Sequence, residues 1–154
     1  MIKTIKTLRV AVLAAMVLGS GMANAKASSE TCVPIGGTAL GQFFNEGKDV
    51  IGAMSGTWSA TRGKVVSQKK TTTGISLEME HAFSTREGGV VLTRDKIALT
   101  TAPGKKDSYL LDIAYNVAKS FGHLKGYSGT FYSKGRLDMD SGEAVVRYRG
   151  KLCK

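Results

Sequence analysis

Apolar and polar residues alternate along three stretches of the chain, at residues 75–83, 109–117 and 144–152. A two-residue period places successive side chains on opposite faces of a β-strand. No stretch after residue 25 keeps the period of an amphipathic helix. The pattern therefore predicts three strands, each with one apolar face toward a core. On the first of them this face carries Ile75, Leu77, Met79, His81 and Phe83.

Weaker alternation predicts further strands, separated by turn-forming residues. Glycine, proline and aspartate occur between several of them, at residues 86–89, 103–106 and 140–143. Such residues favour the tight turns that join antiparallel strands. The further strands are expected at residues 38–45, 52–60, 63–70, 89–95, 96–101 and 130–138.

Glycines inside these stretches indicate the architecture. Gly41, Gly56, Gly63 and Gly135 fall within predicted strands, where glycine marks a bend or a bulge. Strongly curved strands favour a closed barrel over a flat sandwich, and closure removes exposed sheet edges. We therefore predict an all-β fold, a single closed antiparallel β-barrel of about eight strands.

The first 25 residues have the composition of a secretory signal peptide. Three cations in the first nine residues precede an apolar run at 10–18, and Ala23 and Ala25 occupy positions −3 and −1. The run is shorter than the roughly 20 residues that span a bilayer, although a signal anchor is the alternative. We expect cleavage after Ala25, leaving one domain at residues 26–154. This domain is expected to be periplasmic or secreted, with no membrane span after processing.

Two cysteines, Cys32 and Cys153, lie near the two ends of this domain. In an exported protein such a pair predicts a disulfide. Two free thiols or a shared metal are the alternatives, but no histidine lies near either cysteine at ligand spacing. A disulfide would hold the first and last strands side by side.

The 154-residue chain carries a formal net charge of +10, of which three cations lie in the predicted signal peptide. This balance favours anionic surfaces, although it also serves solubility alone. Arg62, Arg147, Arg149 and Lys151 form a possible cationic patch, for which two tyrosines, Tyr132 and Tyr148, offer stacking faces. The pattern is compatible with weak binding of an anionic polymer.

His81 is the most informative candidate for chemistry, because alternation aims it inward. An inward histidine serves as a general base, contacts a ligand in a cavity, or is a core residue that donates to a backbone carbonyl. Four other residues join it as cavity candidates: Met79, Phe83, Tyr109 and Tyr115. No catalytic residue can be assigned from the sequence.

Other motifs argue for no metal and no cofactor. His81 and His123 are too far apart for metal-ligand spacing, and no phosphate or dinucleotide fingerprint occurs. Residues 138–143 carry acidic side chains as a calcium loop does, but the later ligands are missing. A hairpin turn explains the same residues.

Two known families share short motifs with the chain. Residues 56–58, Gly-Thr-Trp, resemble the G-x-W signature of lipocalins, in which a late arginine packs on the tryptophan. Arg147 or Arg149 would take that place here. Residues 121–129, Phe-Gly-His-Leu-Lys-Gly-Tyr-Ser-Gly, resemble the glycine-framed segment of dirigent proteins and allene oxide cyclases. Residues 140–148 are similar to the closing hairpin of dirigent proteins.

The second resemblance covers only the C-terminal third of the chain. It implies an eight-stranded barrel with an apolar cavity, often assembled as a homo-oligomer, and it carries over no active-site residue. We therefore expect an exported barrel that binds a small apolar or amphipathic ligand in its cavity. The alternatives are a cyclase or isomerase of the allene oxide cyclase or dirigent type, and a basic envelope-associated interaction protein. Small barrels can also be filled solid by side chains.

Overall fold

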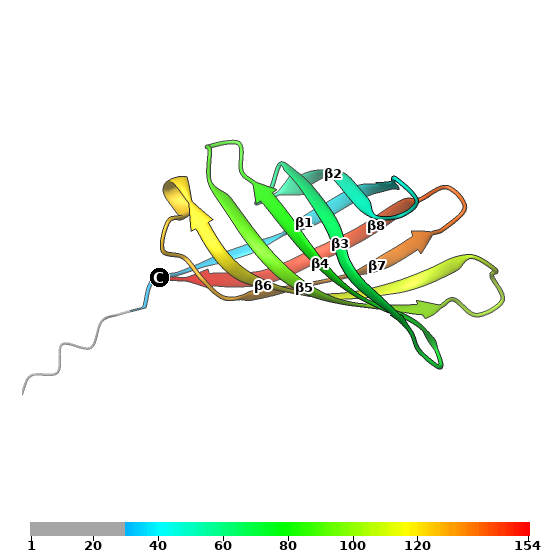
Figure 1. Ribbon diagram of the computed structural model, residues 1–154. Helices are drawn as coiled ribbons and strands as arrows, with labels where there is room; N and C mark the ends of the chain where they lie inside the picture. The colour runs from blue at the N-terminus through cyan, green and yellow to red at the C-terminus, as the bar shows by residue number, and fades with distance from the viewer. Residues whose placement is uncertain (1–29) are drawn as a thin grey trace, which may run out of the picture.

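The computed structural model describes residues 30–154, so the predicted signal peptide lies outside the described residues. Eight strands follow one another around a closed barrel, each antiparallel to the next, and the last strand pairs with the first (Figure 1). This confirms the predicted all-β closed barrel. The strands are β1 (Cys32–Phe44), β2 (Asp49–Gly56), β3 (Ala60–Lys70), β4 (Gly74–Ser84), β5 (Val90–Thr101), β6 (Ser108–Phe121), β7 (Thr130–Asp138) and β8 (Glu143–Cys153).

The three clearest predicted strands are confirmed as β4, β6 and β8. Two weaker predictions need correction. Residues 89–95 and 96–101 form the single strand β5, because their inward alternation continues across residues 95 and 96. Residues 52–60 are not one strand: β2 ends at Gly56, which has a φ of 93°, and Trp58 lies in the connection to β3.

Trp58 closes the end of the barrel at which β1 begins and β8 ends. Its side chain is only 1% exposed and packs against Phe83 and Phe131, with ring centroids 5.7 and 5.9 Å away. Leu124 of the short 3₁₀ helix η1 (Gly122–Leu124) is buried at the same end. This apolar packing closes one end of the barrel.

Tyr148 fixes Trp58 in place, and neither Arg147 nor Arg149 does so. The Trp58 backbone N–H donates to the Tyr148 hydroxyl over 3.0 Å, and this hydroxyl donates to the carbonyl of Ser55 over 2.8 Å. Arg147 and Arg149 are exposed, because alternation along β8 sends them outward on either side of Tyr148. The expectation of a lipocalin-like arginine on the tryptophan is therefore wrong.

The predicted disulfide is confirmed. Cys32 and Cys153 are bonded, and they occupy paired positions where β1 meets β8. The bond therefore lies across the seam that closes the barrel. Disulfides are typical of proteins that fold in an oxidising compartment outside the cytoplasm.

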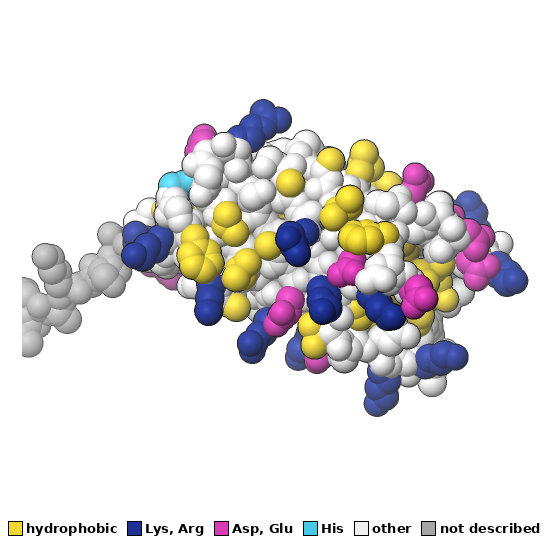
Figure 2. Space-filling view, turned by 45° about the horizontal axis from the view of Figure 1, so that its top comes forward, with side chains coloured by type: hydrophobic (Ala, Val, Ile, Leu, Met, Phe, Trp, Pro, Cys, Tyr) yellow, Lys and Arg dark blue, Asp and Glu magenta, His cyan; other side chains and the backbone are white. Residues whose placement is uncertain are grey.

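The outer face of the barrel is rich in charge. Figure 2 shows lysine, arginine and acidic side chains spread over the viewed face, with apolar side chains between them. No helix within residues 30–154 is long and apolar enough to cross a membrane.

The opposite end of the barrel is formed by turns and by one long hairpin. The β3–β4 hairpin extends beyond its neighbours (Figure 1), because β2 pairs only with residues 60–64 of β3. The β7–β8 turn is the predicted hairpin, and Asp138 organises it. Its carboxylate accepts bonds from the backbone N–H groups of Asp140 and Ser141 and from the Ser141 hydroxyl. These bonds, led by the Ser141 N–H, lower the pKa of Asp138 below its ordinary value.

Candidate functional site

The interior of the barrel is unevenly filled. Small side chains face inward on one side, including Ala39 and Gly41 of β1, Val50 of β2 and Ala144 of β8. Bulky side chains face them from β4, β5 and β6. The mismatch leaves an internal cavity of about 50 Å³. Ligand pockets for drug-sized molecules measure roughly 300–1,000 Å³, so this cavity admits only a small group.

A larger cleft lies above this cavity, at the end of the barrel opposite Trp58. This mouth cleft has a volume of about 350 Å³ and is bordered by the β1–β2 turn, the β7–β8 turn and the side of β3 at Gln68. Apolar side chains form its floor, with Glu46 and Asp140 at its edge. Phe43 and Leu77 line both the cleft and the cavity. These two side chains therefore belong to the walls of both spaces.

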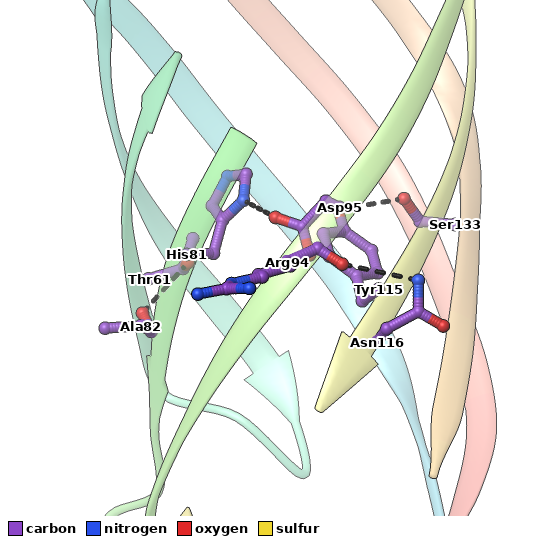
Figure 3. Close-up of polar contacts among 8 residues, drawn as sticks. All are labelled: Thr61, His81, Ala82, Arg94, Asp95, Tyr115, Asn116 and Ser133. Carbon is purple, nitrogen blue, oxygen red and sulfur yellow. Dashed lines mark hydrogen bonds and ion pairs between the residues drawn. The ribbon is translucent and has the colours of Figure 1, made fainter. Parts of the chain in front are cut away.

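A buried histidine–carboxylate pair lies on the inner wall of the barrel. Nδ1 of His81 is 2.6 Å from Oδ2 of Asp95, and the two side chains are 7% and 0% exposed (Figure 3). An ionised carboxylate can only accept, so Nδ1 carries the proton of this contact. When that is the only proton on the ring, Nε2 is a hydrogen-bond acceptor. Asp95 thus orients the imidazole, as carboxylates do for metal-bound and catalytic histidines.

The sequence makes room for this ring at Gly63. His81 and Gly63 are directly paired on β4 and β3, and a Cβ on Gly63 would lie 2.5 Å from Nε2. The ring therefore covers the inner face of the glycine. Nε2 has no hydrogen-bond partner within residues 30–154, and His81 borders the cavity.

A second pair of polar side chains lies next to the His81–Asp95 pair on the barrel wall. The Tyr115 and Ser133 hydroxyls lie 3.1 Å apart on β6 and β7, and Tyr115 is the direct pairing partner of Asp95 (Figure 3). Two buried atoms nearby, Asp95 Oδ1 and Thr93 Oγ1, have no hydrogen-bond partner among the described residues. A buried polar atom without a hydrogen bond costs stability.

Burial raises the pKa of Tyr115 above its ordinary value of about 10. The folded protein therefore favours the neutral phenol, and this contribution to stability is present below pH 10 and lost as the pH rises above it. We expect the free energy of unfolding to fall as the pH rises above about 10, and to fall less in Tyr115→Phe. Urea unfolding of both proteins at several pH values measures this. Parallel pH profiles would contradict the assignment.

The structure brings most of the predicted cavity residues together. His81, Met79, Phe83 and Tyr115 all border the internal cavity. His81 differs from the expected core histidine in one respect, because its partner is a carboxylate and not a backbone carbonyl. Tyr109 packs against the core from the start of β6 and borders neither the cavity nor the mouth cleft.

Two other candidates lie outside the interior. His123 is exposed in η1, at the closed end of the barrel. Arg62 lies on the outside of β3, three strands from Arg147 and Arg149, so the predicted cationic patch does not include it. Tyr148 is buried and offers no stacking face.

Asp95 was missed by the sequence analysis although a signal for it exists. The inward face of β5 carries Val91, Thr93, Asp95, Ile97 and Leu99. Dividing this stretch into two strands between residues 95 and 96 hid the continuity of that face. An acid on an otherwise apolar face, paired by topology with a strand that carries an inward histidine, predicts such a contact.

Comparison of the chain with models of protein families, with curated proteins and with solved structures finds no significant match. The architecture agrees with the barrel that the dirigent and allene oxide cyclase resemblance implied, and no family match supports that resemblance further.

Proposed function

We propose that this protein binds a small amphipathic ligand, which enters at the mouth cleft and places a hydrogen-bonding group against His81. One observation carries the proposal: a cleft of ligand size with an apolar floor shares two lining side chains with a cavity bordered by a buried, carboxylate-oriented histidine. Binding sites of this kind combine a mostly apolar wall with a few fixed polar groups.

The geometry also restricts the chemistry of the ligand. Its body occupies the mouth cleft, while only a narrow leading group fits the cavity of about 50 Å³. The nearby Asp95 carboxylate disfavours a second anion, and Nε2 of His81, in the tautomer with its single proton on Nδ1, accepts a hydrogen bond. An uncharged hydroxyl or amide N–H donor on a slender apolar chain meets these requirements.

The compartment is part of the proposal. A disulfide-bonded chain with a signal-like N-terminal sequence meets its ligand in the periplasm or outside the cell. Carriage or sequestration of an exported small molecule requires no cofactor.

A second candidate function is proton transfer to a bound ligand, as in cyclase or isomerase chemistry. The His81–Asp95 pair favours it, because an oriented imidazole in a dry pocket is a general base. The distinguishing result is chemical change of a bound ligand that disappears in Asp95→Asn while binding persists. Binding without chemical change supports the first function.

Binding is tested with the neutral dye N-phenyl-1-naphthylamine and its displacement by 1-octanol. Ala39→Met fills the internal cavity, and the same substitution at the exposed Ala53 of β2 adds the side chain outside the barrel. We expect octanol affinity to fall at least tenfold in Ala39→Met and to remain unchanged in Ala53→Met. Circular dichroism of both variants checks folding. No binding by the wild type, or equal loss in both variants, would refute the proposal.

A further inference from the structure

Cations gather on the outer face of the last two strands. Arg147, Arg149 and Lys151 alternate along β8 and point outward. Arg147 is directly paired with Lys134 of β7, and Arg149 is directly paired with Tyr132, whose side chain is 52% exposed. We call these five residues the β7–β8 cationic face.

This face has little negative charge to balance it. Asp112 of β6 forms an ion pair with Lys134 over 2.9 Å. Within residues 30–154, Arg147, Arg149 and Lys151 form no ion pair. On the other side, β1 contains no charged residue along its whole length. The face therefore keeps an uncompensated positive charge in the folded protein.

The arginines of this face have no acidic partner across the strands. Arg147 lies directly opposite Lys134, whose charge Asp112 already balances, and no acid lies opposite Arg147 or Arg149 on β7. The outer faces of β4 and β5 show the usual arrangement, in which Glu80 lies opposite Arg94 at 3.8 Å. The contrast indicates that an external anion completes the β7–β8 face.

From these observations we infer that the β7–β8 cationic face binds a linear anionic polysaccharide. Cations at alternate positions of one strand are spaced by about 7 Å, which presents a row of charges to an extended polymer. Arginine binds carboxylate, sulfate and phosphate groups through two parallel hydrogen bonds. The exposed Tyr132 ring beside Arg149 offers a flat surface on which a sugar ring packs. The disulfide favours a compartment outside the cytoplasm, where polysaccharides are the abundant polyanions.

This inference is independent of the cavity, because every residue of the face points away from the barrel interior. Its test uses a heparin-derived oligosaccharide as the probe and the disulfide-bonded protein. Arg147→Gln/Arg149→Gln removes two alternate cations from β8. Arg62→Gln/Lys64→Gln removes two alternate exposed cations from β3 and is the matched control for net charge.

We expect the β8 double variant to bind the oligosaccharide at least tenfold more weakly, with a shallower dependence of affinity on salt. The β3 control should change affinity less than threefold, and Tyr132→Ala should weaken binding without changing the salt dependence. All variants should bind N-phenyl-1-naphthylamine as the wild type does, which separates this face from the cavity site. Equal loss in the two double variants would overturn the face as a site. Tighter binding of a single-stranded oligonucleotide of equal charge would overturn the polysaccharide assignment.

Discussion

Loss of the Cys32–Cys153 disulfide is expected to lower the free energy of unfolding by about 2–5 kcal/mol. The bond spans a sequence separation of 121 residues. In the chain-entropy model a loop of that size restricts the unfolded chain by nearly 5 kcal/mol. The bond also lies across the β1–β8 seam, which brings together the first and last strands and carries the largest loop-closure cost in the fold.

Urea unfolding of Cys32→Ser/Cys153→Ser against the oxidised wild type measures this effect. The double substitution leaves no free thiol to form intermolecular bonds. Wild type in reducing agent serves as the control and should match the variant. A difference below about 1 kcal/mol would contradict the assigned contribution.

His81→Leu is expected to lower the free energy of unfolding by about 3–5 kcal/mol. The substitution leaves Asp95, whose side chain is fully buried, without its one hydrogen-bond partner among the described residues. An unpaired buried carboxylate is among the costliest single defects in a protein core.

The double variant His81→Leu/Asp95→Leu should recover most of that loss, because it removes the stranded charge together with its partner. Urea unfolding of wild type, both single variants and the double variant completes the cycle. A stable His81→Leu variant would show that the pair does not form. A double variant no more stable than the singles would show that packing alone explains the loss.

Recovery in the double variant would also bear on function. A polar pair that leucines replace without loss is not required for folding, so its role lies elsewhere. Under the proposed function, the stable double variant should lose octanol binding. The substitutions at these two positions would then abolish octanol binding while most of the stability is kept.

The strand pattern made much of the barrel predictable. Alternation located β4, β6 and β8, since one face of each strand meets the core and the other meets water. Two cysteines near the two ends of the predicted domain were enough to predict the seam. The strand predicted at residues 52–60 is wrong at Trp58. Aromatic residues are common in strands, so composition alone does not distinguish a strand residue from a tryptophan that closes the barrel end from a connection.

The site was less accessible from the sequence, because its parts come from strands far apart along the chain. The inward direction of His81 followed from alternation, but its partner depended on the register between β4 and β5. The cavity volume depends on small residues such as Ala39 and Ala144 facing bulky ones across the barrel. No local pattern encodes that relation. The cationic face likewise could not be predicted from the sequence, because it depends on the pairing of β7 with β8. The strand order places Arg62 three strands away from Arg147 and Arg149.

The most direct measurement of the proposed binding mode is the ¹⁵N NMR spectrum of the histidine side chains during titration with 1-octanol. The chain contains two histidines, and the exposed His123 at the closed end is an internal control for His81. A hydrogen bond from the alcohol should shift the Nε2 resonance of His81 in a saturable manner and leave the His123 resonances in place. Octanol binding with unchanged His81 resonances would contradict the proposal that a ligand enters the barrel and contacts this ring.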